Sequence, residues 1–191
     1  MCSWAYKAVD AFDLDRELVA VAFNMLDRYL ATELKSDCAI TREDFQLFCM
    51  TCLYTAVKIL EPTRKFSIPA LIDMSRGYYC AEDVLETEVE IIDALEWRLN
   101  PPTALCFVGE LLASIQVPAE FMTCCRLYTE MAVMDEYFVP HKASTVAVAA
   151  VLTAARQHNY PTDEILARVD KWMDVNMNDV TAICDYFVAK M

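Results

Sequence analysis

Residues 45–57 read FQLFCMTCLYTAV, and these 13 residues carry no charge. A second charge-free stretch of 13 residues, ASTVAVAAVLTAA, spans 143–155, which lies 98 residues further along the chain. Both stretches are longer than an ordinary strand, and a helix that is apolar on every side belongs at the centre of a bundle. The pair therefore predicts an all-α protein with two bundles, each built around one buried helix.

The two halves of the chain also resemble each other outside these stretches. Segment 52–58, CLYTAVK, aligns with 150–156, AVLTAAR, and the upstream segment MLDRYL at 25–30 aligns with VMDEYF at 133–138. Order and residue type match in both alignments, which indicates a tandem duplication. The proline pair of Asn100-Pro101-Pro102 disfavours helix before it and predicts the boundary. We therefore expect one domain over 1–100 and a second over 101–191.

Caps and helix breakers place about five helices in each half. Thr41 and Asp44 have the spacing of a capping box at the start of the first central helix. Asp15 is suited to cap the next upstream helix, and Gly77 follows a short one. Besides an N-terminal and a central helix, we expect helices over 15–31, 68–74 and 81–97 in the first half. The second half is expected to have helices over 104–114, 119–134, 144–157, 163–170 and 176–190.

The composition excludes several classes of function. The chain has only two glycines, too few for a phosphate-binding loop, a dinucleotide fingerprint or a hairpin-rich fold. Its 29 acidic and 16 basic residues give a net charge of −13. A nucleic acid or an acidic membrane surface would repel such a chain, so neither is an expected partner. No apolar run approaches the roughly 18 residues of a membrane span.

The nine cysteines are an odd number, and several lie inside helical patterns. Because the N-terminus also lacks the features of a signal peptide, we expect reduced thiols that fill the core of an intracellular protein. Cys49 and Cys52 have metal-ligand spacing, but they lie in the central helix without a second Cys/His pair nearby. Neither His141 nor His158 adjoins a nucleophile, so we expect no catalytic, cofactor-binding or metal-binding residue.

Two charged residues stand in apolar surroundings. Lys58 is the only charge between residues 45 and 60, and Glu88 lies in the middle of the apolar stripe of helix 81–97. A lysine near a helix C-terminus can simply reach water, whereas a carboxylate on an apolar face needs a pairing partner or an interface. These residues therefore indicate either an internal pair or a polar pair that meets a partner. In the second case both side chains should be exposed in the free protein.

Several motifs together resemble the cyclin box. They are MLDRYL at 25–30, Leu53 to Ala56-Val57-Lys58-x-x-Glu61-Pro62, Val84-Leu85-x-x-Glu88, and LxWxLxPPT at 95–103. Spacing and order agree over residues 18–105, and the segment VPHKASTVA at 139–147 resembles the C-terminal cyclin fold. The resemblance covers nearly the whole chain and implies two tandem five-helix cyclin folds.

The resemblance implies a regulatory subunit with no catalytic group of its own. Cyclins form heterodimers with cyclin-dependent kinases and activate them allosterically, which controls cell-cycle progression in the nucleus and cytoplasm. In the family, a lysine and a glutamate that correspond to Lys58 and Glu88 hold the kinase backbone. The kinase-contacting residues implied here are Lys58, Ile59, Glu61, Leu85, Glu88 and Trp97.

The sequence departs from the family's pattern near its N-terminus. Cys2 stands where cyclins usually carry an arginine that pairs with the aspartate matching Asp27, and Ala8 replaces a usual tryptophan. A docking patch for kinase substrates or inhibitors would use Met1, Trp4, Phe45 and Gln46. Asp27 and Asp135 occupy matching positions of the two repeats, and with Leu47 they are expected to have structural roles.

Two other classes of protein share this fold. A transcription-initiation module of this kind contacts DNA and should be basic, which the net charge of −13 opposes. A scaffold that binds no kinase would have no need for Lys58 and Glu88.

Overall fold

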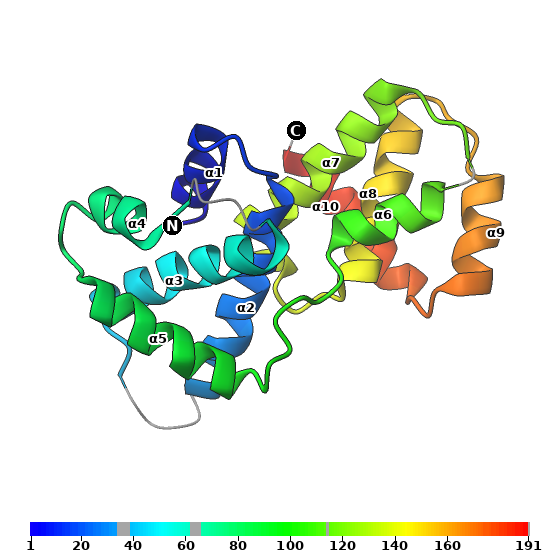
Figure 1. The fold of residues 1–191 in the computed structure, drawn as a ribbon. Coiled ribbons are helices and arrows are strands. Elements are labelled where there is room, and N and C mark those ends of the chain that lie inside the picture. Colours follow the sequence, from blue (N-terminus) through cyan, green and yellow to red (C-terminus); the bar gives the residue numbers. More distant parts are fainter. Residues whose placement is uncertain (34–38, 62–65, 114, 191) are drawn as a thin grey trace. The chain divides into compact units, whose positions relative to one another are not determined.

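The computed structural model of the chain describes residues 1–33, 39–61, 66–113 and 115–190. The described residues form ten α-helices and one short 3₁₀-helix, and they contain no strand. The chain divides into two compact units, Met1–Pro101 and Pro102–Met191 (Figure 1). The predicted all-helical fold is therefore confirmed.

The first unit is built around one central helix, α3. Its helices are α1 (Cys2–Ala11), α2 (Glu17–Glu33), α3 (Arg42–Leu60), α4 (Ile68–Met74) and α5 (Ala81–Ala94). Helix α3 packs against α2, α4 and α5. Every residue from 49 to 57 is buried except Tyr54, which is half-buried. The charge-free stretch of the sequence is therefore the helix that the other helices cover.

The predicted caps start and end these helices. In the capping box of α3, the Thr41 N–H donates to Asp44 Oδ2 over 3.0 Å and the Asp44 N–H donates to Thr41 Oγ1 over 3.1 Å. Asp15 Oδ1 accepts from the Glu17 N–H at the start of α2. Gly77 follows α4 with a φ of 71°, a conformation that suits glycine.

Helix α5 ends earlier than the sequence predicts, at Ala94 rather than near Trp97. Glu96 and Trp97 take left-handed conformations with φ of 50° and 61°, and the Trp97 N–H donates to the Ile92 carbonyl over 3.1 Å. This bond satisfies a carbonyl of the last helical turn and reverses the chain. It leaves the Trp97 side chain beyond the helix, with 73% of its surface exposed.

The second unit repeats the plan around α8. Its elements are α6 (Ala104–Leu112), α7 (Ala119–Met134), η1 (Glu136–Phe138), α8 (Ala143–Gln157), α9 (Asp163–Trp172) and α10 (Met177–Lys190). Helix α8 packs against α6, α7 and α10, and every residue from 145 to 155 is buried.

The two aligned segments around Asp27 and Asp135 differ in structure. Residues 25–30 lie within α2, whereas their counterparts leave the helix at Asp135. The Asp135 carboxylate accepts from the Tyr137 N–H, from the Tyr186 hydroxyl over 2.8 Å, and pairs with Lys190 over 3.3 Å. These interactions lower the pKa of the Asp135 carboxyl, and the hydrogen bond from the Tyr137 backbone contributes most. Asp135 thus holds the end of α10 beside η1.

Candidate functional site

The two anomalous charges meet between α3 and α5. Lys58 Nζ lies 2.8 Å from Glu88 Oε2, and the Thr55 hydroxyl donates to Glu88 Oε1 over 3.1 Å. Both oxygens of the carboxylate are therefore held from α3. The hydrogen bond to Glu88 raises the pKa of Lys58, so the ammonium stays charged. Sequence reasoning missed Thr55, although its position one turn before Lys58 in an apolar helix was a usable signal.

The pair is asymmetric in its exposure. The Lys58 side chain is 53% exposed, whereas that of Glu88 is only 6% exposed. The expectation that both side chains are exposed in the free protein is wrong for Glu88. An ionised carboxylate in this position requires its two partners, because desolvation without them is costly. Of the two charged side chains, only that of Lys58 is therefore widely accessible from outside.

Exposed apolar side chains accompany the pair on both helices. Ile59 follows Lys58 on α3 with 42% of its surface exposed, and Leu85 lies one turn before Glu88 on α5 with 45% exposed. The exposure of Leu85 suits the contact role that the resemblance implies for it. We call Lys58, Glu88, Ile59 and Leu85 the α3–α5 site.

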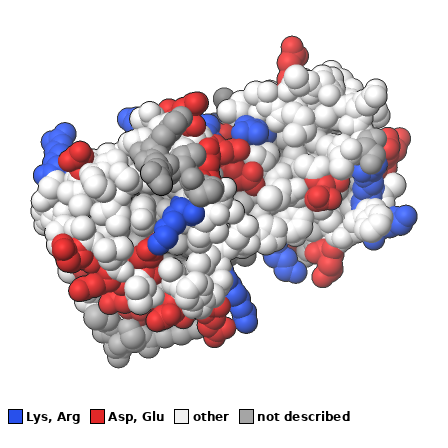
Figure 2. Space-filling model, viewed as in Figure 1, with Lys and Arg blue, Asp and Glu red and all other residues white. Residues whose placement is uncertain are grey.

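The surroundings of the α3–α5 site are acidic. Figure 2 shows carboxylates gathered along α5, where the sequence places Glu82, Asp83, Glu86, Glu90 and Asp93. Glu61, at the end of α3, accepts from the Asp15 N–H over 3.4 Å and so touches the start of α2. Pro62, which follows Glu61 in the cyclin-box motif of the sequence, lies outside the described residues.

The residues of the expected docking patch lie on two helices. Met1 and Trp4 belong to the start of α1, and Phe45 and Gln46 belong to the first half of α3, where Leu47 is also half-buried. Met1 is exposed, and the other three patch residues are half-buried. In the described part of the chain, no hydrogen bond or ring contact joins the two pairs.

Cys2 is close enough to Asp27 for the two groups to interact. Burial raises the pKa of the Cys2 thiol to about 11, and the charge of Asp27 adds to this rise. Asp27 keeps exposed surface on α2, yet the protein packed around it raises the pKa of its carboxyl by desolvation. A cation at position 2 would oppose the rise in the pKa of Asp27 by pairing with its carboxylate.

Replacing Cys2 with arginine is therefore expected to raise the melting temperature by a few degrees. An added ion pair at a partly exposed site contributes up to about 1 kcal/mol, and in a chain of this size each kcal/mol is worth about 2–4 °C. Because the pKa of Asp27 is raised in the folded state, its protonation favours folding at acidic pH, and this contribution disappears as the pH rises through that pKa. The gain from arginine should accordingly appear at pH 7 and vanish in acid.

Differential scanning calorimetry at both pH values measures the shift. The matched control is Ser3→Arg, which adds the same charge at an exposed position of α1 and should leave the melting temperature unchanged. An equal rise in both variants would show that net charge, not the Asp27 contact, is responsible.

The expectation that the thiols fill the core holds for Cys49, Cys52, Cys125 and Cys184, which are buried, and is wrong for Cys80 and Cys106, which are exposed. The described cysteines are free, and Cys49 and Cys52 are buried in α3. Burial raises the pKa of Cys49 to about 12, which makes it a poor thiolate. No three metal-ligating side chains come together in the described ranges, and none of the helices described there is long and apolar enough to cross a bilayer.

Comparisons with known proteins agree with this architecture. The family model "Cyclin, N-terminal domain" matches residues 1–100, and "Cyclin, C-terminal domain" matches residues 102–188. At 17% sequence identity, the X-ray structure of a viral cyclin from herpesvirus saimiri shares the fold with a TM-score of 0.76, covering 96% of this chain and 81% of that one.

Similar sequences carry cyclin names. Cyclin-A1-2 of Arabidopsis thaliana is 28% identical over 81% of this chain and 35% of its own length. The G2/mitotic-specific cyclin-2 of Medicago sativa is 26% identical over 81% of this chain and 45% of its own length. The chain thus spans less than half of each of these relatives. Since the two family models together match nearly every residue, the chain belongs to the cyclin family.

Proposed function

We propose that this chain binds a cyclin-dependent protein kinase and activates it as a non-catalytic regulatory subunit. The observation that carries the proposal is the α3–α5 site, where a half-exposed lysine is fixed by a buried carboxylate among exposed apolar side chains. Charged groups surrounded by apolar contacts are typical of interface hot spots. The described residues offer a docking surface, and the chemistry would belong to the kinase.

The site suits recognition of a kinase backbone. An ammonium has three donors, and Glu88 takes one of those of Lys58, so the others can reach backbone carbonyls of a partner. Thr55 and Lys58 fix the Glu88 carboxylate before a partner arrives, which reduces the ordering cost of binding. Ile59 and Leu85 would exclude water from the contact.

Activation would then be allosteric. A cyclin docked beside the kinase C-helix presses that helix inward, so that its glutamate pairs with the strand lysine that positions the ATP phosphates. We further propose that the complex controls cell-cycle progression in the nucleus and cytoplasm. The names of the relatives, such as G2/mitotic-specific cyclin, support this role. Kinase substrates or inhibitors would dock near Met1, Trp4, Phe45 and Gln46.

A pull-down from cell extract tests the proposal directly. The purified chain is expected to recover a cyclin-dependent kinase, identified by mass spectrometry, and to raise its phosphorylation rate with purified components. Its net charge of −13 predicts no salt-dependent retention on duplex DNA. Strong DNA binding without a kinase would favour an initiation-factor role, and recovery of neither would favour a scaffold.

A further inference from the structure

The second unit contains a counterpart of the α3–α5 site. Helices α5 and α10 both have 14 residues, and their buried residues stand at the same four positions. This correspondence places Cys184 at the position of Glu88. The alignment of α3 with α8 places Thr153 opposite Thr55 and Arg156 opposite Lys58. The threonine and the cation are thus kept in the second unit, while the carboxylate is replaced by a thiol.

The replacement leaves the arginine without a counter-ion. Burial raises the pKa of the Cys184 thiol. A hydrogen bond with Thr153 and the charge of Arg156 both lower this pKa and so offset part of the rise. The Thr153 hydroxyl donates to the Ala149 carbonyl over 2.7 Å, within its own helix. A protonated thiol cannot balance a guanidinium, and no carboxylate among the described residues forms an ion pair with Arg156. Arg156 is exposed, so water solvates its guanidinium in the free chain and a ligand can replace that water.

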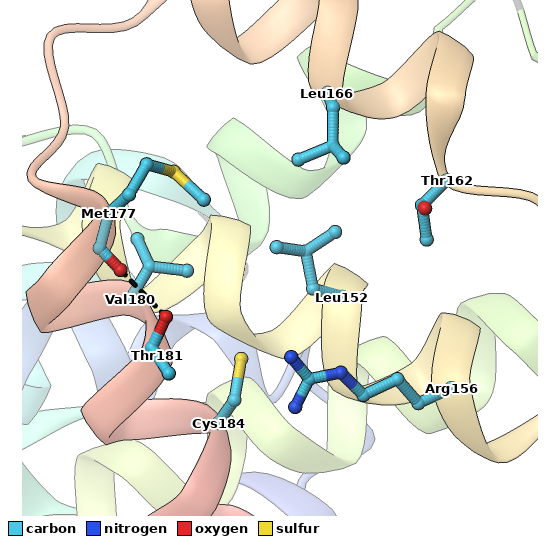
Figure 3. Close-up of a pocket in the computed structure, with 8 residues that line it drawn as sticks. All are labelled: Leu152, Arg156, Thr162, Leu166, Met177, Val180, Thr181 and Cys184. Carbon is cyan, nitrogen blue, oxygen red and sulfur yellow. Dashed lines mark hydrogen bonds between the residues drawn. The ribbon is translucent and has the colours of Figure 1, made fainter.

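Arg156 lines a pocket of about 240 Å³ between α8, α9 and α10. Figure 3 shows its guanidinium extending from α8 toward Cys184 on α10, with Leu166 of α9 on the opposite side. The other residues that line the pocket are Leu152, Thr162, Met177, Val180 and Thr181. The pocket thus combines one cation with mostly apolar walls.

We propose that this pocket binds a segment of a partner protein that sets an aspartate or glutamate on Arg156 and an aliphatic side chain against Leu166. The planar guanidinium matches a carboxylate in a bidentate pair. Phosphorylated segments are usually held by clusters of arginines, and this pocket has one. Its volume is below the roughly 300–1,000 Å³ of small-molecule sites, which favours side chains of a peptide.

The test is a selection of random displayed peptides on the whole 191-residue chain. Peptides that combine an acidic and an aliphatic residue are expected to be enriched on the wild-type chain and on Lys142→Gln, which removes an exposed cation elsewhere in the same unit. Arg156→Gln should abolish this enrichment. For the best peptide, Arg156→Gln and an acid-to-amide change in the peptide should each weaken binding at least about tenfold, and the two together should add little.

A second variant excludes misfolding as the cause. Leu166 is exposed, so Leu166→Asp should remain folded by circular dichroism while its new carboxylate repels the peptide. The proposal is overturned if no peptides are enriched, if those enriched lack acids, or if Arg156→Gln binds them equally well. Arg156-dependent self-association in sedimentation would instead make a second copy the occupant. Kinase recovery by Arg156→Gln should be unchanged, so either proposal can fail without the other.

Discussion

Replacing Lys58 with alanine is expected to weaken kinase binding by about 2–4 kcal/mol, because backbone carbonyls of the kinase would be left buried and unpaired. The same change should lower the free energy of unfolding by about 1–3 kcal/mol. The Glu88 side chain is only 6% exposed, and without Lys58 its charge would keep one hydrogen bond, from Thr55. The stability loss follows from the observed burial of Glu88.

Calorimetric titration with the recovered kinase and urea unfolding of the free chain measure the two effects of Lys58→Ala. The control is Asp93→Ala, on the exposed side of α5, which should change either free energy by no more than about 0.5 kcal/mol. Unaltered kinase binding by a folded Lys58→Ala chain would show that the pair is only an internal salt bridge.

Replacing Glu88 with leucine is expected to weaken kinase binding while leaving the free energy of unfolding of the free chain nearly unchanged. Removing one partner of an ion pair is costly when the remaining charge stays buried, but the charge that Glu88→Leu leaves behind, on Lys58, is half-exposed. Val84 and Ile91 already make this face of α5 apolar. The half-exposed Lys58 can turn to water, and Thr55 can donate within its own helix, as Thr153 does to Ala149. We therefore expect the free energy of unfolding to stay within about 1 kcal/mol of the wild-type value.

Kinase binding by Glu88→Leu should nevertheless fall by about 2–4 kcal/mol, because Lys58 loses the group that orients it and the partner loses a carboxylate. The double variant Lys58→Ala/Glu88→Leu provides the internal comparison, again by titration and urea unfolding. If a stranded carboxylate causes the instability of Lys58→Ala, the double variant should be more stable than Lys58→Ala alone. A Glu88→Leu chain less stable than Lys58→Ala would contradict this account.

Local sequence was sufficient to predict the helical framework. A stretch of 13 residues without charge is longer than an ordinary strand, and a helix that is apolar on every side is buried, so α3 and α8 were predictable as the two centres. The capping box of Thr41 and Asp44 was predictable as well, because its bonds join residues three positions apart. The motifs around Lys58 and Glu88 were also enough to indicate the family.

Which partners hold the buried charge of Glu88 depended on contacts between helices. Periodicity placed Glu88 on the apolar face of α5, but only the packing of α3 against α5 showed that Thr55 and Lys58 hold its two oxygens. The early end of α5 escaped prediction because a left-handed turn can form at residues other than glycine.

Arg156, in the second unit, is another residue whose environment only the tertiary structure shows. In the sequence it is one more cation near the end of a central helix, like Lys58. The tertiary structure shows that its neighbour on α10 is the thiol of Cys184, where the first unit has a carboxylate. Whether a charge is satisfied is decided by the element packed against it, and helical periodicity within one segment does not contain that information.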